Sequence, residues 1–232
     1  MNLNRGYLAD FLSLLFPQLC EACNEKLSGQ EKLICTNCLY HLPYTNFHQQ
    51  ADHIVAQQFW GKIALEASYA LFYFTKGGKV QRLMHHLKYK NKPQIGTLLG
   101  QIAGNQLVVN DKLKSVDVII PVPLHPSRMR KRGYNQSEHF ANGLAERLKA
   151  IVSAKNLVRS KATETQTQKS RYARFENVKS VFVIKNPEAL AGKHILLVDD
   201  IMTTGSTLES CGQILLQIEG VKLSIATIAY AE

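Results

Sequence analysis

The sequence predicts an α/β fold with a parallel sheet flanked by helices, preceded by a small cysteine-rich unit. Strand-sized apolar runs alternate with helix-like segments from Ala67 onward, which is typical of parallel strands joined by helices. Four of the five cysteines lie in residues 20–38. The chain has 232 residues, 45% of them hydrophobic, which is enough for a sizeable core. We expect an N-terminal helix and four-cysteine unit over 1–45, a linker over 46–66 and the α/β domain over 67–232.

The first nineteen residues are apolar but are not typical of a signal peptide. Asp10 interrupts them, and no small-residue cleavage site follows. Their apolar residues recur at the spacing of one helix face, as Leu8, Phe11, Leu12, Leu15 and Phe16. No apolar run in the chain approaches the roughly 18 residues that a membrane-spanning helix requires. We therefore expect an N-terminal amphipathic helix and a cytoplasmic protein whose thiols stay reduced.

The paired cysteines predict a metal site. Cys20 and Cys23 are two residues apart, as are Cys35 and Cys38, and eleven residues separate the two pairs. Two such pairs facing each other supply four thiolates, the tetrahedral set that suits Zn²⁺. An iron–sulfur or redox role and a pair of disulfides are the alternatives. A closed four-thiolate site has no open coordination position, so we expect structural zinc that folds its segment and does not catalyse.

The α/β part is expected to build its site at the carboxyl ends of its strands. We expect His48 and His53, in the polar linker before it, to be solvated. Strands are predicted over 68–75, 116–120, 181–184, 195–198 and 223–230, and helices over 80–89, 95–107 and 206–218, with a further helix marked by Phe140, Leu144, Leu148 and Ile151. Ligands of such sheets bind outside the carboxyl ends of the strands. The loops after Ile120 and Val198 are therefore the places where we expect the chemistry.

A loop with two carboxylates and several hydroxyl groups follows the strand that ends at Val198. Asp199 and Asp200 come first, and the loop then continues with Thr203, Thr204, Gly205, Ser206 and Thr207. Free backbone N–H groups at a helix start bind phosphate, and a glycine allows close approach. The two aspartates are suited to ribose hydroxyls or to Mg²⁺. This combination indicates 5-phosphoribosyl-1-pyrophosphate; the alternative is a strand followed by an N-capped helix. Neither G-x4-G-K-[ST] nor G-x-G-x-x-G occurs in the chain.

The net charge of +10 is concentrated in two segments. Residues 125–134 hold four basic and no acidic residues, and residues 155–179 hold seven basic and two acidic ones. Nine of the ten excess positive charges therefore lie in these segments. Both are rich in turn and polar residues, so we expect loops around an anionic ligand, either a polyphosphate or a nucleic acid.

The chain resembles the ComF family. The segment around Asp199 is similar to the phosphoribosyl pyrophosphate motif of type I phosphoribosyltransferases. Residues 121–125 read Pro-Val-Pro-Leu-His, and Arg128-x3-Arg132-Gly133-Tyr134-Asn135-Gln136-Ser137-Glu138 follows, a pattern similar to the family signature. ComF proteins pair a four-cysteine unit with a type I phosphoribosyltransferase domain and are associated with DNA uptake during natural transformation. The resemblance covers nearly the whole chain and implies this type I fold.

The resemblance also implies roles for particular residues. Arg128 and Arg132 would meet the pyrophosphate, while Asn135 and Gln136 orient oxygens or cap the following helix. A flexible catalytic loop would cover the site over 160–179. Its binding and catalytic residues would be Gln166, Arg174 and Asn177. Lys88 and Tyr89 match a short Lys-Tyr motif of the family, and a surface lysine beside a packed tyrosine is the equal alternative. We expect Arg130 and Lys131 to face solvent.

The expected function is that of a glycosyltransferase. Phosphoribosyl pyrophosphate would bind with Mg²⁺ and pass its phosphoribosyl group to an acceptor that the sequence does not identify. The alternative is a non-catalytic module that senses phosphoribosyl pyrophosphate or binds single-stranded DNA. The basic segments contain few aromatic residues for stacking bases, which weighs against DNA. A competence helicase remains open as a partner, and so does a dimer as the oligomeric state.

Overall fold

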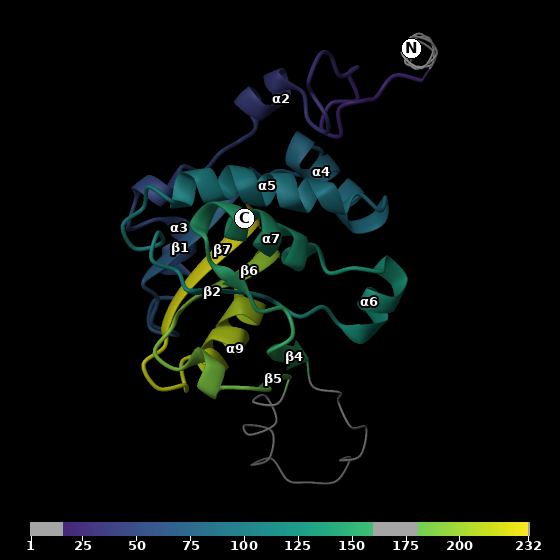
Figure 1. Ribbon diagram of the computed structural model, residues 1–232. Helices are drawn as coiled ribbons and strands as arrows, with labels where there is room; N and C mark the ends of the chain where they lie inside the picture. Colours follow the sequence, from purple (N-terminus) through teal and green to yellow (C-terminus); the bar gives the residue numbers. More distant parts are fainter. Residues whose placement is uncertain (1–15, 160–180, 232) are drawn as a thin grey trace, which may run out of the picture.

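The computed structural model describes residues 16–159 and 181–231 (Figure 1). A five-stranded sheet has the order β1-β7-β6-β2-β3, and all its neighbouring strands are parallel. Its strands are β1 (Ala67–Phe74), β2 (Val118–Pro121), β3 (Ile151–Val152), β6 (His194–Met202) and β7 (Lys222–Ala231). A separate antiparallel pair joins β4 (Leu157–Arg159) to β5 (Phe182–Ile184). The predicted parallel α/β architecture is confirmed.

Helices cover both faces of the sheet. The longer ones are α4 (Lys79–Tyr89), α5 (Pro93–Leu107), α7 (Gln136–Leu148) and α9 (Ser206–Leu215); the shorter ones are α2 (Thr36–His41), α3 (Ile54–Gln57), α6 (Pro126–Arg132) and the 3₁₀ turns η1 (Phe47–Gln49) and η3 (Glu188–Leu190). Figure 1 shows α5 and α7 on one side of the sheet and α9 on the other. The strands are accordingly near-continuous apolar runs, since β6 and β7 are buried on both faces. None of the helices in the described ranges combines the length and apolar character needed to cross a membrane.

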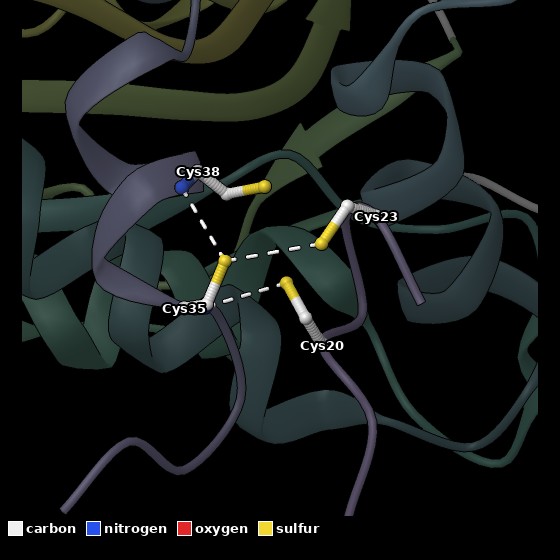
Figure 2. A group of neighbouring side chains, drawn as sticks. All are labelled: Cys20, Cys23, Cys35 and Cys38. Atoms are coloured by element: carbon white, nitrogen blue, oxygen red, sulfur yellow. Dashed lines mark hydrogen bonds between the residues drawn. The ribbon is translucent and has the colours of Figure 1, made fainter. Parts of the chain in front are cut away.

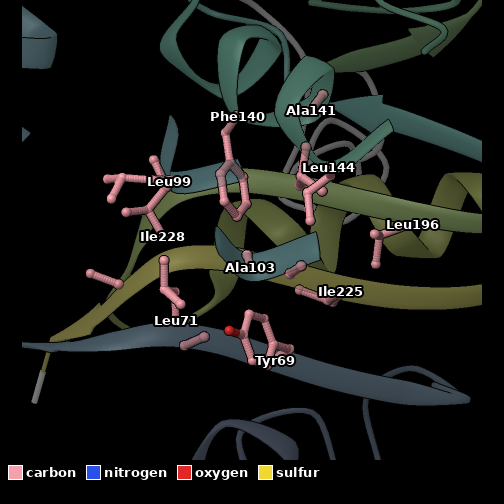
Figure 3. Close-up of a cluster of buried hydrophobic side chains, with 14 of the residues drawn as sticks. Tyr69, Leu71, Leu99, Ala103, Phe140, Ala141, Leu144, Leu196, Ile225 and Ile228 are labelled. Atoms are coloured by element: carbon pink, nitrogen blue, oxygen red, sulfur yellow. The ribbon is translucent and has the colours of Figure 1, made fainter. Parts of the chain in front are cut away.

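The main core lies between the sheet and the pair α5 and α7. Phe140 and Leu144 of α7 lie over the sheet together with Leu99 of α5 (Figure 3). The two helices cross in backbone contact, because Gly100 and Gly143 meet there. A Cβ added to Gly100 would lie 2.3 Å from the carbonyl oxygen of Phe140, so the crossing admits no side chain. This close crossing brings the start of α7 down onto the sheet, where the polar residues of β6 lie.

The chain reverses its direction of winding between β2 and β6. The connection after β2 runs through α7 to β3 at one edge, whereas the connection after β6 runs through α9 to β7 on the other side. Because β2 and β6 are neighbours, the two loops that leave them diverge and a crevice opens between them. In sheets of this kind the ligand binds at such a switch point. The predicted location of the site, after Ile120 and Val198, coincides with this crevice.

Two predicted elements form but differ from the prediction in placement or extent. Residues 181–184 are expected in the main sheet, but β5 pairs with β4 outside it. Ile151 is expected on the apolar face of a helix, but it begins β3 and is 72% exposed. The reason is the left-handed backbone of Lys149, with φ +58°, which ends α7. The helical spacing of apolar residues continues past Lys149, but the helix itself ends there.

The segment 46–66 is more ordered than a linker. It contains η1 and α3 and buries Phe47, Val55 and Phe59. His53 is 5% exposed, so the expectation that it is solvated is wrong. Its ring stacks on Phe47, with centroids 4.2 Å apart; its Nδ1 accepts the N–H of Ala56, and its Nε2 lies 3.0 Å from the carbonyl oxygen of Ser68. Both ring nitrogens therefore have partners inside the protein.

Candidate functional site

A pocket of about 840 Å³ lies at the carboxyl ends of β2 and β6. Its walls come from α4, the chain between β2 and α7, β6 and the start of α9. One side is acidic and the other basic. The polar residues that line it include Lys88, Tyr89, His125, Arg128, Lys131, Arg132, Gln136, Ser137, Arg159, Asp199, Asp200, Thr203 and Thr207. The structure thus brings Asp199, Asp200, Arg128, Arg132, Gln136, Thr203 and Thr207, all predicted from sequence, to one cavity.

The two aspartates lie near the end of β6 and contact the first turn of α7. Ser137 Oγ donates to Asp199 Oδ1 at 2.9 Å. The side-chain amide of Gln136 donates to Asp200 Oδ2, and Lys88 Nζ lies 2.9 Å from the same oxygen. Asp200 is buried and Asp199 is partly buried. The carboxylates therefore lie in a fixed hydrogen-bonded frame with one cation from α4.

Asn135 explains why α7 starts at this point. Its Oδ1 accepts the N–H of Ser137 at 3.1 Å, which caps the helix, and its Nδ2 donates to the carbonyl oxygen of Val122 at 3.0 Å. The start of α7 is thereby tied to the chain that leaves β2. Asn135 is buried behind the pocket, so of its two predicted roles the structure has the capping one.

The pKa of Asp199 is raised from 3.8 to about 7. Burial is the largest cause, because removing a carboxylate from water disfavours its charge, and the neighbouring charge of Asp200 adds to it. The hydroxyl of Ser137 and the charge of Lys88 act in the opposite direction. Asp199 and Asp200 therefore share a proton near neutral pH, unless a bound cation compensates the negative charge that Asp199 gains when it loses this proton.

The basic side of the pocket is a helix, which corrects the expectation of a loop over 125–134. His125 caps α6 through its Nδ1, which accepts the N–H of Ser127, and no residue of this described helix is buried. Figure 1 shows α6 extending away from the body of the molecule. Arg128, Lys131 and Arg132 share its inner face at spacings of three and four residues and line the pocket. Lys131 was expected to face solvent; it is exposed, and it also lines the pocket.

The hydroxyl-rich loop leads into α9. Gly205 precedes the helix at φ +75°, a conformation that favours glycine, and a Cβ there would lie 3.0 Å from Cζ of Phe59. Gly205 offers no side chain to cap α9; the N–H of Ser206 donates weakly to Thr204 Oγ1 at 3.5 Å, and the other N–H groups of the first turn have no partner within the helix. Thr203, Thr204, Ser206 and Thr207 are all exposed; Thr203 and Thr207 line the pocket, and the hydroxyl oxygens of Thr204 and Ser206 are 3.2 Å apart.

Some predicted residues lie elsewhere, and others were missed. Gln166, Arg174 and Asn177 fall outside the described residues. Ser137 was missed as a partner of Asp199, although a helix cap at Asn135 places Ser137 in the first turn of α7. Tyr89 is exposed, which contradicts the packed alternative, and the guanidinium of Arg132 lies 5.5 Å from its ring centroid. Lys88 is drawn into the site by its ion pair with Asp200.

The four cysteines of the N-terminal unit converge (Figure 2). Their sulfur atoms all lie within 4.8 Å of one another, and the Sγ atoms of Cys23 and Cys35 are 3.8 Å apart. Four thiolates at about 2.3 Å from a tetrahedral zinc ion have their sulfurs about 3.8 Å apart. All four are free thiols in the structure, so the alternative of two disulfides is not seen. The cluster could hold a metal ion.

Backbone groups around the cluster prepare it for negative charge. The N–H of Cys35 donates to Sγ of Cys20 at 3.3 Å, and that of Cys38 donates to Sγ of Cys35 at 3.4 Å. Burial by itself raises the pKa of Cys20, but backbone N–H groups oppose it, and the resulting pKa is about 7. In Cys38, burial and the neighbouring thiols raise the pKa to about 12. Hydrogen bonds from neighbouring groups to the ligand atoms are common around metal-bound thiolates.

Comparison with known proteins defines the class first. Residues 135–232 match the family model of the phosphoribosyl transferase domain. Among solved structures, glutamine phosphoribosylpyrophosphate amidotransferase from B. subtilis is 18% identical, with a TM-score of 0.43, over 62% of this chain and 30% of that chain. A crystal structure of adenine phosphoribosyltransferase is 15% identical, with a TM-score of 0.38, over 65% and 74%. The C-terminal part, residues 135–232, is a phosphoribosyl transferase domain.

Three curated proteins are also similar to this chain, two of them over most of its length. Competence protein F of Haemophilus influenzae is 28% identical over 221 residues, covering 92% of this chain and 90% of that protein. DNA utilization protein YhgH of Escherichia coli O157:H7 is 29% identical over 203 residues, covering 86% and 84%. Competence protein ComFC of Bacillus subtilis is 37% identical over 100 residues, 43% and 38% of the two chains. The chain is thus similar over most of its length to competence protein F and to DNA utilization protein YhgH, and over part of it to ComFC, and the predicted resemblance is confirmed.

Proposed function

We propose that the pocket binds phosphoribosyl pyrophosphate with Mg²⁺ and that the protein transfers the phosphoribosyl group to an acceptor. The observation that carries the proposal is the meeting of Asp199 and Asp200 with the basic face of α6 and the start of α9 in one cavity. These three groups of residues match the three parts of that molecule: the aspartates suit the sugar, α6 suits the pyrophosphate, and the start of α9 suits the terminal phosphate. The phosphoribosyl transferase domain supports the same ligand.

Each end of the ligand has its own set of groups. The 5-phosphate is assigned to the loop 203–207, where N–H groups at the start of α9 and the hydroxyls of Thr203 and Thr207 would donate to its oxygens. The pyrophosphate is assigned to Arg128 and Arg132, whose planar guanidinium groups suit phosphate oxygens. The ribose hydroxyls would then lie over the two aspartates of β6.

The reaction would break the bond between C1 of the ribose and the pyrophosphate oxygen, which keeps the electron pair. The acceptor forms a new bond to C1 and gives up its proton. Bound Mg²⁺ supplies charge neutralisation to the leaving pyrophosphate. Arg128 and Arg132 would stabilise the same developing charge, and the carboxylates of Asp199 and Asp200 would hold the ribose against an oxocarbenium-like state. Gln166, Arg174 and Asn177, which lie outside the described residues, keep their expected binding and catalytic roles in this proposal.

The four-cysteine cluster is assigned to structural zinc. Four closely spaced thiolates leave no position for a substrate, so the ion would fold residues around it. Reduced thiols of this kind are consistent with a cytoplasmic protein. Zinc and magnesium thus have separate places and separate tasks.

Calorimetry tests the proposal directly. Phosphoribosyl pyrophosphate would be titrated into the metal-loaded protein with and without Mg²⁺, and we expect binding that requires the cation. The variant Asp199→Asn/Asp200→Asn should lose it. A matched control is Asp117→Asn, because Asp117 accepts the N–H of His194 at the opposite end of the sheet and should leave binding unchanged. Equal binding by wild type and the double variant would refute the proposal; release of pyrophosphate on adding candidate acceptors would identify turnover.

A non-catalytic module that senses this ligand or binds single-stranded DNA is the second candidate. Tyr89 favours it, because it presents a 62% exposed aromatic ring beside the guanidinium of Arg132. The basic segments alone offered few stacking residues, but α4 adds this one from elsewhere in the chain. Relatives named competence protein and DNA utilization protein support a role in DNA uptake, in which a helicase would be a natural partner.

The DNA-binding candidate predicts a steep salt dependence. Affinity for a fluorescent oligonucleotide should fall as salt rises, and phosphoribosyl pyrophosphate should compete for the same basic face. Tyr89→Ala should weaken oligonucleotide binding more than it weakens binding of the small ligand. Binding that is absent, or insensitive to salt, would eliminate this candidate.

A further inference from the structure

The last turn of α4 connects the four-cysteine unit to the pocket. Figure 1 shows α4 between the N-terminal unit and the body of the molecule. His86 and Lys88 leave this turn toward different neighbours, and Lys92 follows just beyond the helix end. Two of the three contact the cysteine unit, and the third contacts Asp200.

Glu21 makes the contact on the cysteine side. It stands between two cluster residues, Cys20 and Cys23, and its backbone N–H donates to the carbonyl oxygen of Leu33 in the same unit. Its Oε2 lies 2.6 Å from Nδ1 of His86, and its Oε1 lies 2.9 Å from Nζ of Lys92. The side chain of Glu21 is only 12% exposed and that of His86 is 21% exposed, so this contact is partly shielded from water, whereas Lys92 is 45% exposed.

Three contacts hold the same turn on the pocket side. Lys88 Nζ lies 2.9 Å from Asp200 Oδ2. The hydroxyl of Tyr134 donates to the carbonyl oxygen of Leu87, and the ring of Tyr89 lies under the guanidinium of Arg132. A shift of the turn would therefore displace the cation that faces Asp200 and, with it, groups on the basic side.

We propose that Glu21 is a positioning residue for the pocket. By holding His86 and Lys92, it fixes the last turn of α4 in the place where Lys88 reaches Asp200. A helical turn is rigid over this length, so a constraint on residue 86 sets the position of residue 88, and the contact of Lys92 holds the chain that leaves the turn. The four-cysteine unit thereby acts on the site without contributing a residue to it. This inference rests on the proposed function for its effect on ligand binding, but its structural part does not.

The structural part is tested without any ligand, by chemical labelling of Lys88. A lysine that is paired with a buried carboxylate reacts slowly with an acylating reagent, and mass spectrometry gives the rate at each lysine. Glu21→Gln should raise the rate at Lys88 between about twofold and thirtyfold, the range that coupling through contiguous contacts spans. Asp200→Asn, which removes the partner itself, sets the upper limit of the effect.

Glu31→Gln is the matched control. Glu31 is a carboxylate of the same unit, and it accepts the N–H groups of Ser28 and Thr36, both within that unit. The same substitution there should leave the Lys88 rate unchanged. Lys92→Met and His86→Gln break the connection from the α4 side while leaving the cysteine unit intact, and both should raise the rate as Glu21→Gln does.

A second measurement separates this inference from the proposed function. Affinity for phosphoribosyl pyrophosphate with Mg²⁺ is measured in wild type, Glu21→Gln, Lys88→Met and the double variant. If Glu21 acts through Lys88, its substitution weakens binding in wild type and has no further effect in the Lys88→Met background. Absence of binding in wild type would refute the proposed function alone, since the labelling result stands by itself.

Two outcomes would overturn the inference. One is an unchanged Lys88 rate in both Glu21→Gln and Lys92→Met. The other is a rise in Glu21→Gln alone, accompanied by loss of bound zinc, since damage to the cysteine unit would then explain it. Zinc released per chain by a thiol reagent is therefore measured for every variant.

Discussion

The four-cysteine cluster and the pocket at β6 differ in how the chain assembles them. The cysteines come from nineteen consecutive positions, and two pairs with equal spacing bring them together. The pocket gathers Lys88, Gln136 and Asp200 from three elements that are far apart in the chain. The first site depends on local geometry and, in our proposal, on an ion, whereas the second depends on the packing of α4, α7 and the sheet. Removing a component should therefore have different consequences in the two regions.

Metal removal should have the largest effect, and only on the cysteine side. A chelator, or Cys38→Ser, removes a contribution that reaches about 10 kcal/mol or more in small zinc-folded units. We expect backbone amides of residues 18–42 to lose protection from hydrogen exchange while those of β6 and β7 keep it. Mass spectrometry reads both regions in one experiment. Protection that is equal with and without the chelator would mean that thiol packing alone folds the unit.

The next largest effect is expected from a single methyl group on the pocket side. Gly205→Ala places a Cβ at φ +75° and 3.0 Å from Phe59, and should lower the free energy of unfolding by about 2 to 3 kcal/mol. Gly133→Ala is the matched control, because its φ is +82° but nothing lies within 4 Å of the added Cβ. It should cost about 1 kcal/mol. Equal urea midpoints for the two variants would show that the contact with Phe59 contributes nothing.

Two arginines of α6 test whether ligand binding depends on the position of a basic group or only on its charge. Arg128 lines the pocket, while Arg130 lies outside the set of described residues that line it, and both are exposed. Arg128→Ala should weaken binding of phosphoribosyl pyrophosphate about tenfold to hundredfold, as expected for lost hydrogen bonds to a charged group. Arg130→Ala should change it less than about twofold. A similar loss in both variants would indicate a diffuse electrostatic effect.

The smallest effect concerns pH. With its pKa raised to about 7, Asp199 is protonated in the folded chain between pH 4 and 7, where the unfolded chain has lost that proton. Its contribution to stability therefore falls as the pH rises through this window. Ligand binding with Mg²⁺ requires the carboxylate, so affinity should rise at most about tenfold from pH 6 to pH 8, with proton release at the lower pH.

Calorimetry in buffers of different ionisation enthalpy measures that proton release. Asp199→Asn should abolish the part of the release that is centred near pH 7. Its urea stability, relative to wild type, should increase as the pH rises from 5 to 8. A variant with the same proton release as wild type would assign the titration to another group.

The same contrast explains what could be predicted from the sequence. Local patterns predicted the cysteine cluster, the strand that carries Asp199 and the hydroxyl loop, because each is encoded by residues that lie close together in the chain. Lys88 and Ser137 could not be assigned as partners of the aspartates, since that depends on where α4 and α7 pack. The tight crossing of Gly100 and Gly143 sets that packing, and no periodicity reveals it.

Charge patterns were less informative than spacing. The basic segment 125–134 was expected to be a loop because it is polar, yet a histidine cap and a proline start a short helix there. Residues 46–66 were expected to be a linker for the same reason. Their buried Phe47, Val55 and Phe59 are too few and too irregularly spaced to give a periodic signal. Whether 46 and 66 bound separate domains stays a prediction.

The edge of the sheet at β1 gives residues 43–45, which come just before that segment, a further importance. Tyr44 forms a bridge with Phe72, the N–H of Thr45 donates to the carbonyl oxygen of Leu71, and the N–H of Tyr73 donates to that of Pro43. These contacts occupy backbone groups of an outer strand that would otherwise pair with other chains. A fragment that starts at residue 67 would leave this edge open and should self-associate. Soluble expression of the enzyme-like half therefore requires the residues that follow the cysteines.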